Sequence, residues 1–277
     1  MDYKRILTVQ DISCVGQCSL TVALPILSAC GLETAILPSA VLSTHTAGFN
    51  GYTFRDLTDD MPAIKAHWEK ENIRFSAIYT GYLGSAKQIE YVKDMLASLG
   101  TTDFVSIVDP VMADNGKLYH GFDADFVENM KSLAFGADYI VPNLTEACFL
   151  TGTEYRTEYD DKYINDLLGK LISAGAKNII LTGVSYRPGK PGVVVCDGEK
   201  TDYYEHRLIS KGCHGTGDVY TSAFVGALMA GKSPLDAARI AADFTVLCIE
   251  NTQGDADHWY GVKFEPVLGE IINMINA

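Results

Sequence analysis

Short apolar runs alternate with longer stretches of helical spacing along almost the whole chain, and this alternation restricts the possible folds. Residues 5–9 form a short apolar run. Residues 16–30 then carry Leu and Ala at helical spacing, Gly31 ends that stretch, and residues 34–37 form a second apolar run. About eight predicted strands alternate with helices in this way. The pattern predicts an α/β protein, a three-layer α/β/α sandwich with a mostly parallel central sheet.

The predicted elements fill the 277 residues. Further strands are expected at 75–80, 104–108, 139–142, 178–183, 193–196 and 201–205, and helices at 62–72, 86–99, 160–174, 219–230, 234–250 and 264–276. No Ser/Pro-rich run, charge block or internal repeat marks a linker, and no segment is left for a separate lid domain. We therefore expect a single domain over residues 1–277, with 47% hydrophobic residues to fill its core.

The formal net charge of −13 argues against nucleic acid and against an anionic membrane surface as partners, because both require a basic footprint. An acidic protein that binds phosphate groups must build positive potential locally. Helix N-termini, backbone N–H groups and a metal ion can supply it.

Seven cysteines are scattered without a Cys-x-x-Cys pair or a Cys/His cluster, so the sequence predicts neither a disulfide framework nor a zinc site. The first residues have no signal-peptide pattern, and no apolar run approaches the roughly 18 residues of a membrane span. We expect a reducing, cytoplasmic setting.

A glycine-rich stretch precedes the predicted helix 219–230 and reads Lys211-Gly212-Cys213-His214-Gly215-Thr216-Gly217-Asp218. Gly215 and Gly217 bracket Thr216, so the backbone can point several N–H groups the same way at a helix N-terminus, as in an anion site. Asp218 would lie in the first helical turn, where it could take a proton from a nucleophile held near a transferring phosphate. These are also ordinary helix-start residues, because an acid there stabilises any helix by roughly 0.3–1 kcal/mol.

Polar residues also follow two of the buried strands. Asp109 stands at the carboxyl end of the run 104–108, directly before Pro110. Packing gives little reason for a carboxylate there, whereas binding of a metal ion or a phosphate network would explain it. Asn143 and Glu146 follow the next strand with the spacing of a capping box, which accounts for both residues without any function.

Four further stretches accompany the Gly215-Thr216-Gly217-Asp218 motif. They are Ser43-Thr44-His45-Thr46, Thr80-Gly81-Tyr82-Leu83-Gly84-Ser85, Val108-Asp109-Pro110-Val111-Met112 with 116–119, and Pro142-Asn143-Leu144-Thr145-Glu146. Together, and in this order, they resemble the pyridoxal/pyridoxamine kinases, the vitamin B6 branch of the ribokinase-like small-molecule kinases. The resemblance implies a ribokinase-like fold and ATP-dependent phosphorylation of the 5′-hydroxymethyl group of pyridoxal, pyridoxamine or pyridoxine to its 5′-phosphate, in B6 salvage.

The same resemblance implies roles for particular residues. On the substrate side, a Ser in the first loop contacts the vitamin ring in the family; here Asp11 follows Gln10 and Ser13 comes two residues later, so the ring contact is open between them. His45 and Thr46 would line the substrate pocket, and Tyr82 could lay its ring over the substrate. A structural histidine, a loop cap and an oligomer contact are the competing interpretations of His45, of the first loop and of Tyr82.

On the nucleotide side, Asp109 and Glu146 would support Mg²⁺, with Asn143 helping to organise metal and phosphates. The strand end at Thr182 and Gly183 and the loop 184–192 would border adenine and ribose, and residues 206–212 would cover the phosphates. Asp218 would be the base, with the backbone N–H groups of Gly215, Thr216 and Gly217 holding the phosphoryl oxygens. The resemblance also implies a homodimer; whether a monovalent cation is required and which vitamer is preferred stay open.

Two alternatives to this function follow from the sequence. Hydroxymethylpyrimidine kinase of thiamine synthesis shares the fold, and residues 11–13 resemble its first loop, but its last glycine-motif position tends to be Cys where this chain has Asp218. A non-catalytic B6 carrier would also keep the fold. Cys213 has two interpretations of its own: a small loop residue, or a thiol beside His214 that adds reversibly to the aldehyde of pyridoxal.

Overall fold

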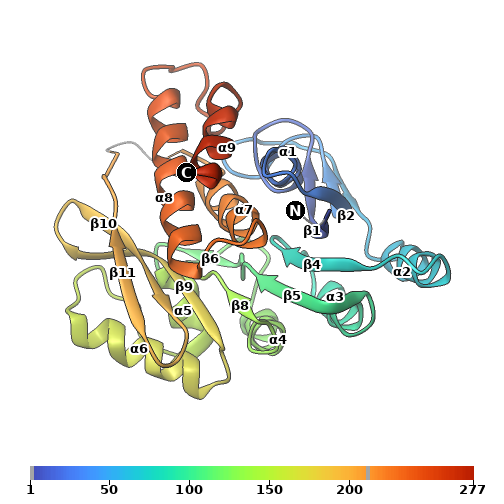
Figure 1. Ribbon diagram of the computed structural model, residues 1–277, viewed down its shortest axis with the longest axis horizontal. Coiled ribbons are helices and arrows are strands. Elements are labelled where there is room, and N and C mark those ends of the chain that lie inside the picture. Colours follow the sequence, from blue (N-terminus) through green and yellow to red (C-terminus); the bar gives the residue numbers. More distant parts are fainter. Residues whose placement is uncertain (1–2, 210–212) are drawn as a thin grey trace.

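A nine-stranded sheet runs through the computed structural model of the chain, which describes residues 3–209 and 213–277 (Figure 1). The strand order is β11-β10-β9-β8-β5-β4-β1-β2-β3. The strands are β1 (Arg5–Ser13), β2 (Glu33–Leu42), β3 (Phe54–Asp56), β4 (Phe75–Thr80), β5 (Gly100–Val108), β8 (Tyr139–Ile140), β9 (Asn178–Arg187), β10 (Lys190–Cys196) and β11 (Thr201–Glu205).

The six central strands, β2, β1, β4, β5, β8 and β9, pair in parallel, whereas β3 at one edge and β10 and β11 at the other are antiparallel. The predicted mostly parallel sheet is confirmed. Because the strands are parallel, the loops that follow β1, β4, β5 and β8 all open at the same edge, which is where open α/β sheets bind ligands.

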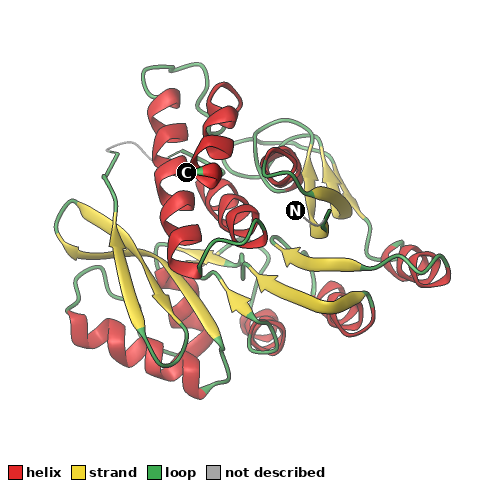
Figure 2. Cartoon of the chain, viewed as in Figure 1, coloured by secondary structure: helices red, strands yellow, loops and turns green. Residues whose placement is uncertain are grey.

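Helices cover both faces of the sheet, as Figure 2 shows in the same view. One layer consists of α1 (Leu20–Ala29), α7 (Thr216–Met229), α8 (Pro234–Thr252) and α9 (Leu268–Asn276). The other consists of α2 (Met61–Lys70), α3 (Ala86–Ser98), α4 (Ala124–Ala134), α5 (Leu144–Thr151) and α6 (Asp161–Ser173). The fold is therefore the predicted three-layer α/β/α sandwich, and among the described residues no segment forms a separate lid domain.

Side-chain caps set the start of several helices, as their sequences suggest. Ser85, Asp123, Asp160 and Ser233 each accept a hydrogen bond from the backbone N–H three residues later. Pro234 follows Ser233 as the first helical residue of α8, which fits because its missing N–H would have no partner there. In the parts of the chain that the structure describes, no helix is long and apolar enough to cross a bilayer.

The structure also corrects the expected elements. Helix α4 was not anticipated, although Phe126, Val127, Met130 and Leu133 have helical spacing and are buried. Strand β9 runs on to Arg187, so part of the expected loop 184–192 is strand, and the chain turns only at 188–189. Residues 113–118 form a small hairpin, β6 (Ala113–Asp114) and β7 (Lys117–Leu118), which the sequence did not indicate. A 3₁₀ turn, Glu265–Val267, precedes α9, which begins at Leu268.

Candidate active site

Three candidate residues lie where neighbouring parallel strands end. Asp11 lies near the end of β1, Tyr82 follows β4, and Asp109 follows β5. The Asp109 N–H donates to the Thr80 carbonyl (2.9 Å) and the Gly81 N–H to the Val9 carbonyl (3.2 Å), so these strand ends are bonded side by side. The candidate site is therefore built at the carboxyl edge of the sheet.

The glycine motif forms the N-terminus of α7. Gly215 is the N-cap, with φ 80° in the left-handed region, and a Cβ there would lie 2.2 Å from the Gln17 carbonyl oxygen. Glycine is thus required both by the conformation and by the close approach of the first loop. Asp218 lies in the first turn of α7, as expected. Lys211 and Gly212, which begin the motif, lie outside the described residues, as do the last three positions of the expected cover 206–212.

Asp218 is half-buried between α7 and the first loop. Burial raises the pKa of Asp218 to about 7; a hydrogen bond from the Ser19 backbone N–H opposes the rise, and the charge of Asp11 adds to it. Ser19 has φ 56°, which is uncommon for a non-glycine residue. The strained backbone at Ser19 thus points its N–H at Asp218. Strained backbone of this kind is often found at functional sites.

Asp11 is only 5% exposed and lies close to Asp218. Burial raises its pKa, whereas hydrogen bonds from the hydroxyls of Ser19 and Ser13 lower it. Ser13 is 1% exposed and donates to Asp11 Oδ2 over 3.0 Å. Of the two first-loop candidates, Asp11 acts through its charge on Asp218 and Tyr82, and Ser13 donates to its carboxylate.

His45 is buried against the first loop and the C-terminal segment. Its Nε2 donates to the Tyr260 carbonyl (2.5 Å), and its Nδ1 accepts from the Ala47 N–H (3.1 Å). Both ring nitrogens are used by the neutral form, and burial lowers the pKa of His45. His45 is thus held as a neutral residue between the first loop and the C-terminal segment.

The other substrate-side candidates are less tightly held. Tyr82 packs against Phe122 (ring centroids 5.6 Å apart), and burial, followed by the nearby Asp11 charge, raises its pKa to about 12. Thr46 is exposed. Cys213 is half-buried and packs against the core on the α7 side of the sheet.

Asp109 is 7% exposed and accepts a hydrogen bond from Thr221 Oγ1 over 2.6 Å. Glu146 is 3% exposed, and its two carboxylate oxygens accept from the backbone N–H groups of Met112 (3.2 Å) and Asn143 (2.9 Å). Burial raises the pKa of both carboxyls; Asp218 adds to the rise at Asp109, and Asp109 adds to the rise at Glu146. The three carboxylates therefore form one electrostatic cluster.

The capping box predicted for Asn143 and Glu146 is present at the start of α5. Asn143 Nδ2 also donates to the Ala113 carbonyl (2.9 Å), which ties the box to the β6–β7 hairpin. Thr182 donates its N–H to the Pro142 carbonyl (2.9 Å) and so joins this group, whereas Gly183 is exposed.

Two functional candidates were missed in the sequence: Ser19, which bonds to Asp218 and Asp11, and Thr221, which bonds to Asp109. Thr221 lies three residues after Asp218 and so on the same side of α7, a spacing visible in the sequence. Ser19 gave no such signal, because its role depends on a positive φ.

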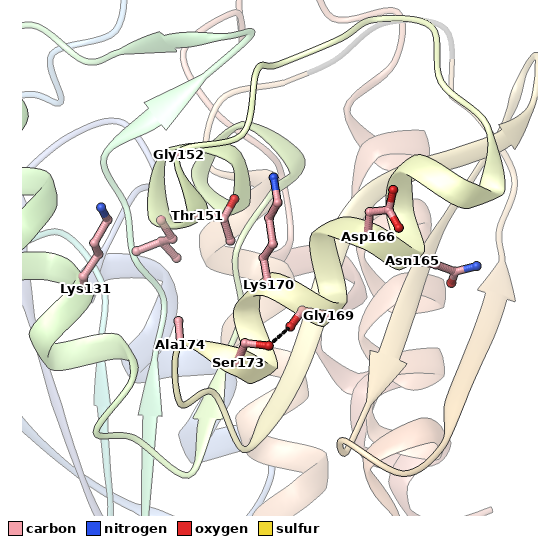
Figure 3. A pocket seen from close by; sticks show the side chains of 10 residues that line it. Lys131, Thr151, Gly152, Asn165, Asp166, Gly169, Lys170, Ser173 and Ala174 are labelled. Carbon is pink, nitrogen blue, oxygen red and sulfur yellow. Dashed lines mark hydrogen bonds between the residues drawn. The ribbon is translucent and has the colours of Figure 1, made fainter.

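A small cavity of about 210 Å³ lies between α7, α8 and the segment that follows β11. Its wall is mostly apolar and includes Leu208, Tyr220, Val246 and Ile249. A larger open groove of about 870 Å³ lies elsewhere, among α4, α5 and α6, with Lys131 and Lys170 on either side of Thr151 (Figure 3). That groove lies at the C-terminal ends of α4 and α5, whereas the candidate site uses the N-terminal ends of α5 and α7.

Comparison with known proteins identifies relatives of this chain. The family model of the phosphomethylpyrimidine kinases matches residues 28–261. A candidate phosphomethylpyrimidine kinase of Bacteroides thetaiotaomicron, crystallised with pyridoxal, has a TM-score of 0.91 and 38% identity, covering 98% of this chain and 96% of that one. Pyridoxal kinase of Lactobacillus plantarum has a TM-score of 0.90 and 32% identity, covering 98% and 97%.

The hydroxymethylpyrimidine/phosphomethylpyrimidine kinase of Bacillus subtilis is 30% identical over 223 residues, 78% of each chain. The chain therefore belongs to the phosphomethylpyrimidine kinase family and is a kinase of the vitamin B6 branch of the ribokinase-like superfamily.

Proposed function

We propose that the protein transfers the γ-phosphoryl group of ATP to the 5′-hydroxymethyl group of a vitamin B6 vitamer. The observation that carries this proposal is the position of Asp218, in the first turn of α7 and close to both Asp11 and Asp109. A base there can face a small alcohol and a phosphate chain at once. The relative crystallised with pyridoxal supports B6 as the substrate class.

In this reaction Asp218 accepts the proton of the 5′-hydroxyl while its oxygen bonds to the γ-phosphorus and the bond from that phosphorus to the ADP oxygen breaks. A pKa of about 7 suits a base at neutral pH, because the group is partly ionised yet still basic. The N–H groups of Gly215, Thr216 and Gly217 at the N-terminus of α7 would hold the phosphoryl oxygens.

Asp109 and Glu146 fit a Mg²⁺ ion that is shared with the nucleotide. Within residues 3–209 and 213–277 no group of three or more His, Cys, Asp or Glu side chains is arranged to hold a metal ion. Mg²⁺ commonly takes only one or two carboxylates together with substrate phosphates. Burial raises the pKa of both carboxyls, and the charge of Asp109 raises that of Glu146 further, so a cation beside them would be favoured. When bound, Mg²⁺ would neutralise charge on the phosphates.

The apolar cavity beside α7 and α8 suits the base of the nucleotide. It lies beside the first turns of α7, with Tyr220 in its wall two residues after Asp218. Pro191 lines it, so the expected loop 184–192 borders the cavity only at its far end. Asn143, Thr182 and Gly183 would then lie toward the phosphates rather than the base.

On the substrate side, Asp11, His45 and Tyr82 would surround the vitamin ring, with Thr46 and Cys213 at its margin and Ser13 behind Asp11. We further propose a homodimer and a cytoplasmic location, which rest on the family resemblance.

A second function, phosphorylation of hydroxymethylpyrimidine, is favoured by the family model and by the Bacillus subtilis relative. It uses the same fold and another flat ring with a hydroxymethyl group. Asp218 separates the two, because the pyrimidine branch tends to carry Cys there.

An ATP-consumption assay with Mg²⁺ tests the proposal, with pyridoxal, pyridoxine, pyridoxamine and hydroxymethylpyrimidine in parallel and Asp218→Ala as the control. We expect turnover on a B6 vitamer that is lost in the variant. Turnover on the pyrimidine alone would move the enzyme to thiamine synthesis, and no ATP turnover with any of the four would support a carrier instead.

A further inference from the structure

A buried polar cluster lies beneath Asp218, on the face of the sheet that α7 covers. It consists of Thr8, Gln10, Tyr79 and Ser222, none of which has exposed surface. Thr8 and Tyr79 are paired neighbours on β1 and β4. Ser222 follows Asp218 by four residues on α7, so the two side chains lie one turn apart on the same side of the helix.

The cluster has hydrogen-bonding groups without partners. Gln10 Nε2 donates to Thr8 Oγ1 over 2.8 Å, but Gln10 Oε1, Tyr79 Oη and Ser222 Oγ have no hydrogen-bond partner among the described residues. Fully buried polar atoms are seldom left unpaired, because each one loses its bonds to water. Three such atoms on adjoining elements therefore call for a physical reason.

The Tyr79 hydroxyl lies close to both other groups. Burial and the charges of Asp109 and Asp218 raise the pKa of Tyr79 well above its usual value, and its hydroxyl faces Ser222 and Gln10. A phenol hydroxyl donates one hydrogen bond and can accept others. Tyr79 can thus donate to Gln10 Oε1 and accept from Ser222 after small side-chain rotations, which satisfies all three atoms.

Gln10 extends the cluster to both substrate loops. A Cβ on Gly81 would lie 2.6 Å from Gln10 Oε1 and 2.7 Å from its Cδ, so the Gln10 side chain lies directly against the Gly81 backbone. Asp11 follows Gln10 and Tyr82 follows Gly81 along the chain. The same side chain therefore supports both loops that carry the proposed ring contacts.

We propose that Gln10, Tyr79 and Ser222 form a buried polar link, with Tyr79 as a positioning residue. The link holds the base Asp218 in a fixed position relative to the two loops that carry Asp11 and Tyr82. The link rests on the proposed role of Asp218. Tyr79 touches no reacting atom; it acts by fixing the second turn of α7 against β1 and β4. Alignment of this kind matters because a misplacement of about 1 Å can cost on the order of 10²-fold in rate.

Tyr79→Phe tests the link, since it removes one oxygen and keeps the ring. We expect kcat for the ring substrate to fall about tenfold while KM for ATP stays within about twofold. Ser222→Ala should act similarly, and the double variant should lose little more than either single one. Tyr139→Phe is the matched control: Tyr139 also packs on α7, through Phe224 (ring centroids 6.0 Å apart), but lies outside the cluster.

The decisive comparison uses the Asp218→Asn background in single-turnover experiments. If Tyr79 acts through the base, adding Tyr79→Phe there should change the residual rate by less than about twofold. A tenfold loss in both backgrounds, or an unchanged kcat in Tyr79→Phe alone, would overturn the proposal.

A urea-denaturation cycle of Tyr79→Phe and Ser222→Ala keeps the link testable apart from activity. Non-additive shifts of the denaturation midpoint are expected, and additive shifts would end the idea of a link. If the wild-type protein consumes no ATP with any ring alcohol, the proposed function fails, and this cycle still decides whether the link exists.

Discussion

Thr221 Oγ1 lies 2.6 Å from Asp109 Oδ2, so a hydrogen bond joins helix α7 to the carboxylate at the tip of β5. Both residues are buried. Because Thr221 is three residues after Asp218, this bond fixes the proposed base relative to the proposed metal ligand. The bond links α7, the helix that begins at the glycine motif, with a strand end more than a hundred residues earlier in the chain.

Thr221→Val should destabilise the protein by about 1–3 kcal/mol, because it keeps the side-chain shape and leaves a buried carboxylate without its donor. The free energy of unfolding in urea measures the effect. Thr245→Val is the control, since the Thr245 hydroxyl donates only to the Ala241 carbonyl of its own helix (2.7 Å). Equal losses in the two variants would show that the bond to Asp109 contributes nothing.

Asp218→Asn should leave ATP binding nearly intact while turnover falls about 10²–10⁴-fold, because the amide cannot accept the hydroxyl proton. Binding is measured by titration calorimetry and turnover by ADP release. Turnover at the wild-type rate would remove Asp218 from the base role.

The same variant has a second effect, on stability. Since the pKa of Asp218 rises from 3.8 to about 7 on folding, the folded state holds its proton more tightly than the unfolded state. The stabilisation is present below about pH 4 and is lost as the pH rises toward 7. Asp218→Asn avoids this loss, so it should be more stable than wild type by roughly 1–3 kcal/mol at pH 8 and not at pH 4. Thermal unfolding at both pH values measures this, and a gain that is the same at both would contradict it.

The sequence predicted the layers and most strand positions because parallel strands buried on both faces and capped helices leave local patterns. It did not predict α4, although Asp123 and the spacing of Phe126, Met130 and Leu133 were visible in it. Nor could it show that β9 continues to Arg187, because a run of Gly and Pro normally marks a loop, whereas here antiparallel pairing with β10 extends the strand.

Candidate-site residues that belong to a sequence motif were predictable, whereas those that only tertiary contacts bring together were not. Asp109, Asn143, Glu146 and Asp218 stand at strand ends or helix starts, which local patterns reveal. The sequence also could not show that Ser13 donates a hydrogen bond to Asp11. Contacts such as those of Ser19 and Tyr79 depend on backbone strain or on strands that meet only in the folded chain.

Gly16→Ala should disturb the pocket wall. Gly16 has φ 126°, and a Cβ there would lie 2.1 Å from His45 Cδ2. We expect KM for the ring substrate to rise and stability to fall by about 1–3 kcal/mol more than in a variant that is strained but not crowded. Gly121→Ala is that control, because its φ is 95° and nothing lies within 4 Å of its Cβ. Equal effects of the two variants would mean that His45 moves aside without cost.

Asp11 should make the enzyme sensitive to charge on its substrate. A buried carboxylate is stabilised by a cation. His45 lies near Asp11, but its ring is held neutral and so supplies no positive charge. Pyridoxamine carries a protonated aminomethyl group, whereas pyridoxine and pyridoxal do not. Asp11→Asn should therefore raise KM for pyridoxamine about tenfold and that for pyridoxine by less than about threefold.

Ser13→Ala, which removes only the bond from Ser13 to Asp11, should change the two KM values in the same order but by smaller factors. Equal changes for both vitamers would show that Asp11 meets a part of the ring that they share.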